Sequence, residues 1–323
     1  MRKVIVIAGL CLAALPVAGF GADEPGIEIG PHVFGDVRAR SVGPAVMSGR
    51  VAAVDAVAAD PRQIWVGTAG GGVWKSRDGG IGFEPVFDDH NQCVGALTID
   101  QARPDTVWVG TGEPWVRNSV SVGDGVYRTV DGGETWTHLG LADSERIAEI
   151  IIHPADPAVV YVAALGHLWG ANEERGLYRT RDGGATWERV LYIDENTGCS
   201  DIALDPENPD TIYAAMWQFR RSADFFTSGG PGSGLYRSTD GGETWSELRT
   251  GLPAGELGRI AIAVPPTRPE TVYAVVEAAE TAFYRSDDRG ETWRRISDDH
   301  TNNEPANKLQ QQYGGQHIDN TNS

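Results

Sequence analysis

Five aspartates recur in one short phrase along the chain, and carboxylates repeated in this way could coordinate calcium or serve as catalytic acids and bases. They are Asp78, Asp131, Asp182, Asp240 and Asp288. Each follows a serine or threonine by two residues, and four of the five copies close with Thr-Trp. Each carboxylate sits in its own repeat, where it can accept backbone N–H groups of its own turn. We therefore expect all five to be structural.

A second set of residues suited to chemistry lies in long polar segments of the second, third and fourth repeats. Flat aromatic rings can stack on sugars or anchor a peptide, and arginine side chains match carboxylates in a fork geometry. Long loops on a rigid scaffold commonly carry function. We predict a ligand-binding site formed by Glu113, Trp115, Arg117, His167, Trp169, Arg220, Arg221 and Phe225. The alternative is that these loops pack on one another and that Trp115 and Trp169 belong to the core.

Catalytic residues are harder to assign. Glycoside hydrolysis needs two carboxylates that face one scissile bond, and Glu113 with Glu173 or Glu174 could form such a pair across neighbouring repeats. The sequence does not give their separation, so we assign no catalytic residue. The seven histidines lack metal-ligand spacing, and the run of three glycines at 70–72 has no helix after it to make a phosphate-binding loop. We expect no cofactor and no metal.

The elements that position these residues are short strands. In the third repeat, apolar runs at 147–152 and 159–165 precede a Gly-Leu-Tyr-Arg-Thr run and a final run that follows the repeated phrase. Gly, Pro and Asp separate the four runs, and no helical period of useful length interrupts them. The repeats recur every 48 to 58 residues. Four antiparallel strands at this period predict an all-β fold, a β-propeller of four-stranded blades with five blades present.

The turn inside the repeated phrase carries two adjacent glycine positions. The second is glycine in all five copies, whereas Arg289 replaces the first in the fifth copy. Glycine is the residue that tolerates positive φ, so we expect positive φ at the second position and not at the first. The closing tryptophans should pack beside the turn. The first copy has Gly82 and Phe83 in place of Thr-Trp, so its hairpin should be the loosest.

The repeated phrase, Ser/Thr-x-Asp-x-Gly-x-Thr-Trp, resembles the Asp-box, or bacterial neuraminidase repeat (BNR). That repeat occurs in sialidases, sortilin-type receptors, photosystem II assembly factors and xyloglucanase-type glycoside hydrolases, where it is a structural hairpin remote from the active site. The phrases at 41–50, 110–114 and 228–234 resemble a family of exported bacterial proteins labelled glycosyl hydrolase or sortilin-like. Members of that family are typically longer and continue with further blades.

The resemblance also allows the hydrolase hypothesis to be tested on the sequence. Xyloglucanase-type enzymes carry a catalytic aspartate in a Thr-Asp-x-Gly-Gly context, and the matching stretch here, at 68–72, has Ala69 in that place. Their second carboxylate comes from a second propeller. Our leading hypothesis is therefore a non-catalytic recognition module that binds a glycan, peptide or protein partner through the long loops. The alternatives are a glycoside hydrolase and an assembly or scaffold factor.

Composition and the ends of the chain narrow the class of protein. The net charge of −18 argues against nucleic acid as a partner. A basic start, an apolar core and small residues at 1–22 predict a secretory signal peptide, followed by the propeller at 23–300 and a polar, disordered tail at 301–323. We expect no membrane span after signal cleavage, and a periplasmic or secreted location. Cys93 and Cys199 begin strands of non-adjacent repeats, which favours two separate buried thiols over a disulfide.

Overall fold

The computed structural model describes residues 50–117 and 120–297. The chain divides into two compact units, Met1–Val42 and Gly43–Ser323, and every described residue belongs to the second unit. The predicted signal peptide and the predicted tail both lie outside the described residues. Among the helices of the described part, none is long and apolar enough to cross a membrane.

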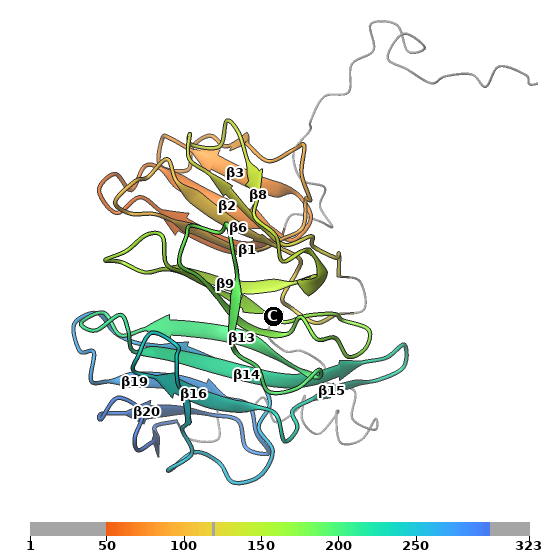
Figure 1. The fold of residues 1–323 in the computed structure, drawn as a ribbon, viewed down its shortest axis with the longest axis vertical. Coiled ribbons are helices and arrows are strands. Elements are labelled where there is room, and N and C mark those ends of the chain that lie inside the picture. Colours follow the sequence, from red (N-terminus) through yellow and green to blue (C-terminus); the bar gives the residue numbers. More distant parts are fainter. Residues whose placement is uncertain (1–49, 118–119, 298–323) are drawn as a thin grey trace, which may run out of the picture. The chain divides into compact units, whose positions relative to one another are not determined.

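Five antiparallel sheets of four main strands make up the described part, and we call them blades one to five in chain order (Figure 1). Blade one contains β1 (Val51–Ala56), β2 (Ile64–Thr68), β3 (Gly72–Ser76) and β4 (Glu84–Pro85). Blade two contains β5 (Val94–Ile99), β6 (Val107–Thr111), β7 (Val126–Thr129) and β8 (Thr137–His138). Blade three contains β9 (Ile147–Ile152), β10 (Val160–Ala164), β11 (Gly176–Thr180) and β12 (Glu188–Leu191).

Blade four has one strand more than the others. It contains β13 (Thr197–Leu204), β14 (Ile212–Arg221), β16 (Gly234–Ser238) and β17 (Ser246–Glu247), and β15 (Phe226–Ser228) pairs with the far end of β14. Blade five contains β18 (Ile260–Ala263), β19 (Val272–Val276), β20 (Ala282–Ser286) and β21 (Arg294–Arg295). A single turn of 3-10 helix, η2 (Ala142–Ser144), precedes β9. These sheets confirm the predicted all-β propeller fold.

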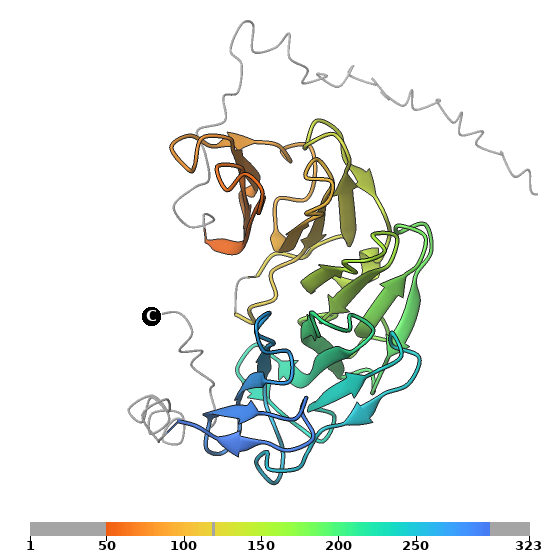
Figure 2. The same cartoon turned by 90° about the vertical axis from the view of Figure 1, so that its left-hand side faces the viewer.

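Each blade packs face to face on the next, and each interface has its own hydrophobic cluster. The cluster between blades one and two contains Trp65 of β2 and Val109 of β6. Corresponding clusters join blades two and three, three and four, and four and five. Because β6 and β10 have neighbouring sheets on both faces, all their residues are buried. Figure 2 shows the blades following one another in chain order, from orange to blue.

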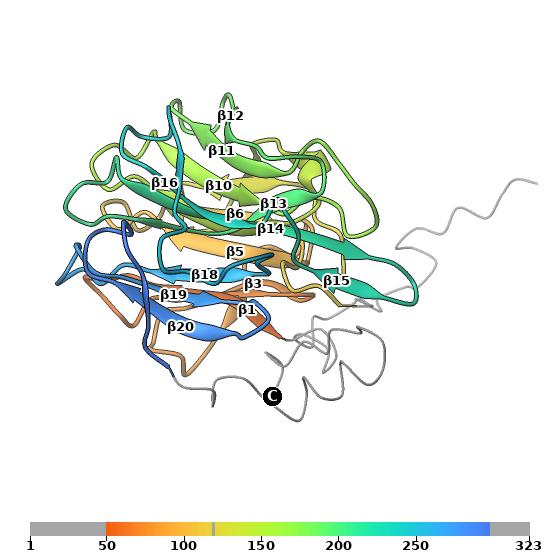
Figure 3. The same ribbon diagram turned by 90° about the horizontal axis from the view of Figure 1, so that it is seen from below.

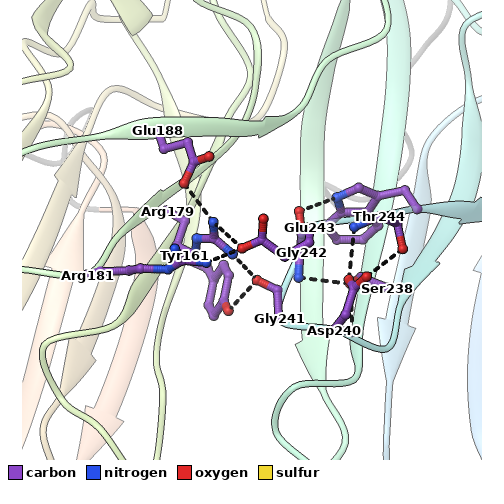
Figure 4. Close-up of polar contacts among 11 residues, drawn as sticks. Tyr161, Arg179, Arg181, Glu188, Ser238, Asp240, Gly241, Gly242, Glu243 and Thr244 are labelled. Carbon is purple, nitrogen blue, oxygen red and sulfur yellow. Dashed lines mark hydrogen bonds and ion pairs between the residues drawn. The ribbon is translucent and has the colours of Figure 1, made fainter.

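The repeated phrase forms the hairpin between the third and fourth strands of each blade, as predicted. In blade four, Ser238 Oγ donates to Asp240 Oδ1 at 2.7 Å, and the same carboxylate accepts the backbone N–H of Thr244 at 2.9 Å and its hydroxyl at 2.6 Å (Figure 4). The equivalent bonds occur in blades two, three and five. In blade one, Gly82 supplies only its backbone N–H. Each of these carboxylates therefore holds its own turn.

Both glycine positions of the turn have positive φ, which corrects the expectation for the first position. φ lies between 90° and 95° at the second position, and at the first it is 70° to 79° for the glycines and 55° for Arg289. Two side chains of blade four bond to the backbone of Arg289. The Arg289 carbonyl oxygen accepts Tyr213 Oη–H at 3.1 Å and an N–H of Arg237 at 2.6 Å. An ordinary residue thus adopts the left-handed conformation of this turn, which Gly79 of blade one has as well, with φ 79°.

Both cysteines of the described residues, Cys93 and Cys199, are free and buried, as expected. Burial, followed by the negative charge of Glu113, raises the pKa of the Cys93 thiol to about 11. Burial also raises the pKa of Cys199. Thiols held in the neutral form at pH 7 are poor nucleophiles, so neither cysteine is a candidate for covalent chemistry.

Candidate functional site

The first strands of all five blades line a central cavity of about 300 Å³. When the five blades are aligned by the pairing of their first and second strands, one position of the first strand faces the cavity in every blade. This position holds alanine in blades one, two and five, Glu149 in blade three and Asp201 in blade four. Because β9 and β13 are neighbours, the only two acidic residues at this position lie next to one another on the cavity wall. All five residues line the cavity.

Glu149 and Asp201 are both partly buried carboxylates with raised pKa values. Loss of hydration, and then the negative charge of Asp201, raise the pKa of Glu149 to about 8. Loss of hydration raises the pKa of Asp201 to about 6. Two interactions act in the opposite direction: Asp201 accepts a hydrogen bond from the backbone N–H of Ile262 at 2.8 Å, and Arg259 contributes a positive charge. At neutral pH, Glu149 therefore carries a proton and can donate it, whereas Asp201 is mostly ionised.

A second pocket, of about 340 Å³, adjoins the cavity, and we call it the rim pocket. Its floor is an ion pair in which Arg50 donates to both oxygens of Glu113, at 2.5 and 2.6 Å. Arg117 lies 3.5 Å from the same carboxylate. Glu113 is 1% exposed, and the two arginines cover its carboxylate. Ala69, in the position of the xyloglucanase aspartate, also lines this pocket.

Trp115 connects the two pockets, because it lines both of them. The guanidinium carbon of Arg259, another residue of the central cavity, lies 4.1 Å from the centroid of a Trp115 ring. The indole is partly exposed and is absent from the hydrophobic clusters of the described residues. The combined site therefore offers one aromatic ring, two partly exposed carboxylates and several cations. This set suits a polar ligand with many hydroxyl groups.

His167, Trp169 and Phe225 lie on loops of blades three and four, Arg220 and Arg221 lie in β14, and none of the five lines either pocket. Trp169 is 54% and Phe225 43% exposed. His167 Nε2 lies 3.0 Å from the Asp143 carbonyl oxygen, and Arg220 bonds to the side chain of Asn196. Arg221 is the last residue of β14. The structure thus brings Glu113, Trp115 and Arg117 together and leaves the other five apart from them.

The long loops also pack on one another, which is the alternative that we considered from the sequence. Val116 of blade two, Leu168 of blade three and Phe219 of blade four belong to one hydrophobic cluster. The buried guanidinium of Arg175 donates to the His167 and Gly170 carbonyl oxygens at 2.8 and 3.0 Å and lies 4.5 Å from the Phe219 ring. Figures 1 and 3 show the β14–β15 hairpin extending beyond the neighbouring strands. Neither Trp115 nor Trp169 is part of this cluster.

Sequence reasoning missed Glu149, Asp201 and Arg259. A signal for Glu149 was present, since it is the one charged residue within the apolar run at 147–152. The predicted partners of Glu113, Glu173 and Glu174, line neither pocket. Within residues 50–117 and 120–297, no three His, Cys, Asp or Glu side chains come together as a metal site.

Comparison with known proteins supports the repeat and the fold. Residues 236–247 and 284–295 match the family model described as BNR/Asp-box repeat. The chain is 29% identical over 201 residues to a xyloglucanase of Paenibacillus sp., a match that covers 53% of this chain and 18% of that protein. It is 25% identical over 211 residues to a xyloglucanase of Hypocrea jecorina, covering 56% and 23%. The match thus spans less than a quarter of each relative.

Solved structures show the same fold. The GH74 enzyme of Niastella koreensis superimposes with a TM-score of 0.56 at 18% identity, covering 76% of this chain and 38% of that one. An ancestral GH74 enzyme superimposes with a TM-score of 0.58 at 18% identity, covering 79% and 34%. At this identity the likeness concerns the fold and not the chemistry of the pockets.

Proposed function

We propose that this chain, an Asp-box repeat β-propeller, binds an oligosaccharide in the central cavity and the rim pocket. One observation carries the proposal: Trp115 lines both pockets, beside partly exposed carboxylates and guanidinium groups. An aromatic face packs against the apolar face of a sugar ring, and charged groups around it accept and donate hydrogen bonds to hydroxyls. The curated relatives are named for a polysaccharide, xyloglucan, which makes glycans the first ligand class to test.

We favour binding alone. In this form of the proposal, the chain does not hydrolyse the glycan with the carboxylate that the xyloglucanase-type enzymes use. Ala69 stands where the resemblance implies a catalytic aspartate, and its methyl group cannot transfer a proton. Glu113 is neutralised by Arg50 and Arg117. The predicted signal peptide would place the protein in the periplasm or outside the cell, and we propose that it meets its ligand there.

A second candidate function is hydrolysis by a different carboxylate pair. Glu149, whose pKa is raised to about 8, could act as the general acid, and Asp201 could stabilise positive charge or activate water. Two carboxyl groups whose environments separate their pKa values are the usual arrangement for acid–base work on glycosidic bonds. This pair is distinct from the aspartate position of the xyloglucanase-type enzymes.

The test uses the full chain with xyloglucan oligosaccharides and a panel of plant, fungal and bacterial glycans. Binding and released reducing sugar are measured in the same samples. We expect a glycan that binds, with Trp115→Ala weakening affinity at least tenfold, roughly 1.4 kcal/mol. Trp169→Ala is the matched control, because Trp169 is exposed and lines neither pocket, and it should bind like the unmodified chain.

The possible results separate the two functions. Binding without sugar release supports recognition alone. Sugar release abolished by Glu149→Gln, with binding retained, supports the second candidate. Binding lost in Trp169→Ala and retained in Trp115→Ala would place the ligand on the loops of blade three and refute the proposed site. Neither binding nor release across the panel would refute the glycan proposal altogether.

A further inference from the structure

Three arginines come together where the long loops of blades three and four meet. Arg146 directly precedes β9, Arg175 directly precedes β11, and Arg220 lies in β14. The guanidinium carbons of Arg146 and Arg175 lie 5.4 and 4.5 Å from the centroid of the Phe219 ring. Arg175 donates to the backbone carbonyl oxygen of Asn196 at 3.2 Å, and Arg220 donates to the side-chain oxygen of the same residue. We call Arg146, Arg175 and Arg220 the arginine row.

The positive charges of the arginine row act on one another. Burial, followed by the charge of Arg175, lowers the pKa of Arg146 to about 9. Burial, followed by the charge of Arg220, lowers the pKa of Arg175 to about 10. Both pKa values lie above neutral pH, so all three side chains are cations there. The row therefore holds three like charges that repel one another.

The hydrogen bonds that the arginine row donates go to neutral oxygens. Arg146 donates twice to the Gly166 carbonyl oxygen, at 2.8 and 2.6 Å, and Arg175 donates to three backbone carbonyl oxygens. Among the residues that the structure describes, no carboxylate forms an ion pair with any of the three arginines. Nη1 of Arg146 is buried and has no hydrogen-bond partner in the same part of the chain.

The two acids that attract Arg175 have other partners. Glu145 lies 3.6 Å from His167 Nε2, and Asp194 accepts the backbone N–H of Asn196 at 2.8 Å. Both carboxylates attract Arg175 without forming an ion pair with it. Three cations therefore stand near two acids that do not contact them, in a chain whose net charge is −18.

Another buried arginine of blade three has two carboxylate partners. Arg179 is as deeply buried as Arg146 and Arg175, yet it pairs with Glu188 at 2.6 Å and with Glu243 at 2.9 Å. A buried charge without an opposite charge beside it is costly, and a buried donor without an acceptor calls for a partner. The arginine row therefore has an excess of positive charge that an anion would balance.

The arginine row reaches the surface at Arg220. The side chain of Arg220 is partly exposed, whereas Arg146 and Arg175 are each 1% exposed. An anion would contact Arg220, and the two buried guanidinium groups would add their attraction, because charges inside a protein are only weakly screened by salt and water. Guanidinium groups match carboxylates in a fork geometry, so a carboxylate is the anion that fits this residue.

On the basis of the glycan-binding function proposed above, we propose that Arg220 binds the carboxylate of an acidic sugar, such as a uronic acid unit of the oligosaccharide. Position favours a sugar over an acidic peptide. Val116 and Phe219 belong to one hydrophobic cluster, and the residues that follow them in the chain are Arg117 of the rim pocket and Arg220. A sugar chain that leaves the rim pocket along this cluster would bring a later unit to Arg220.

The test compares an oligosaccharide of galacturonic acid with its methyl ester, which has the same sugar units without the negative charges. Titration calorimetry on the full chain should show about tenfold tighter binding of the acid form, because the ester cannot make a charge-assisted hydrogen bond to Arg220. Raising the salt concentration should weaken binding of the acid form and leave binding of the ester unchanged. Both comparisons use the unmodified chain, so they decide the question even if a variant fails to fold.

Variants locate the carboxylate. Arg220→Gln should lower the affinity for the acid form to that for the ester. Arg181→Gln is the matched control, because the Arg181 side chain is 59% exposed and pairs with Glu243, and it should keep the preference for the acid form. Trp115→Ala should weaken binding of both forms, as the proposed glycan-binding function requires.

The outcomes separate this inference from the function on which it rests. Equal affinity for acid and ester, with both weakened by Trp115→Ala, would overturn the inference and leave glycan binding in place. A preference for the acid form that survives in Arg220→Gln would place the carboxylate at another cation and refute the role of Arg220. Binding of a neutral glycan but of neither galacturonate form would refute an acidic ligand. An acidic peptide that binds more tightly than the acid form, and does so through Arg220, would identify a protein segment as the occupant instead.

Discussion

Carboxylates in this protein fall into two groups with opposite titration behaviour. In the Asp-box turns, hydroxyl and backbone N–H donors stabilise the ionised form and lower the pKa values of Asp131, Asp182 and Asp240 to about 2. On the cavity wall, loss of hydration raises the pKa values of Glu149 and Asp201. A carboxylate fully engaged by its own turn has no free oxygen for a ligand, so chemistry belongs to the second group.

The raised pKa of Glu149 predicts a stability that falls as pH rises. Between its ordinary value of 4.5 and about 8, the folded chain holds a proton on Glu149 that the unfolded chain has released. Unfolding therefore becomes easier as pH increases through this window. Asp201 acts with the same sign between 3.8 and about 6. We expect the unfolding temperature to fall between pH 5 and 8, at roughly 2–4 °C for each kcal/mol lost.

Glu149→Gln isolates this effect, because glutamine is neutral throughout and similar in shape. Calorimetry of both proteins at pH 5, 6, 7 and 8 should give a flatter profile for the variant. Parallel profiles would mean that Glu149 is hydrated in solution and titrates near its ordinary value. The hypothesis that it can serve as a general acid at neutral pH would then fail as well.

At the scale of the hairpin, two neighbouring arginines of blade three should contribute differently to stability: Arg179 in β11 and Arg181 in the turn that follows it. The Arg179 side chain is 1% exposed, donates to the Gly241 oxygen and pairs with Glu188 and Glu243, whereas Arg181 is 59% exposed and pairs with Glu243 (Figure 4). We expect Arg179→Ala to lower the free energy of unfolding by about 2–4 kcal/mol. Arg181→Ala should change it by about 0.5 kcal/mol or less. Urea denaturation measures both, and equal losses would contradict the role of Arg179 in joining blade three to the Asp-box turn of blade four.

Strands and turns were the part of the structure that the sequence predicted best. In the third repeat, the apolar runs at 147–152 and 159–165 correspond to β9 and β10, which span Ile147–Ile152 and Val160–Ala164. The conformation of Arg289 was predicted wrongly, because we inferred from the arginine that its position does not require positive φ, whereas all five copies have it. The positive φ belongs to the turn itself, since Gly79 has φ 79° at the same position of blade one, which no described blade precedes.

Only part of the candidate site was predicted, because the sequence identified the residues of one loop but not those that meet across two blades. Glu113, Trp115 and Arg117 are close in sequence, so one loop brings them together. Glu149 and Asp201 are 52 residues apart and meet because blades place equivalent register positions around one cavity. Finding them requires the alignment of β9 with β13 to the exact residue, including the irregularity before Asp201. The sequence shows the repeat but not that irregularity.

For the whole molecule, stability should be distributed along the row of blades. Each blade contacts its sequence neighbours through a separate cluster, and no cluster of the described residues joins blade five to blade one. Repeat architectures of this kind derive stability from nearest-neighbour interfaces. The exposed apolar residues Val51 and Val54 of blade one and Phe283 and Ile296 of blade five lie on the two outer faces of this row, against which no other described blade packs.

Amide hydrogen exchange of the unmodified chain should therefore proceed from both ends of the row. We expect slowest exchange in β6, β10 and β14, whose blades are covered on both sides, and faster exchange in β1 and β20 by at least tenfold, because local opening there breaks one interface instead of two. Mass spectrometry of peptides from each strand measures this gradient. Uniform protection across the five blades would contradict this gradient and would mean that the outer faces of blades one and five are also covered in solution.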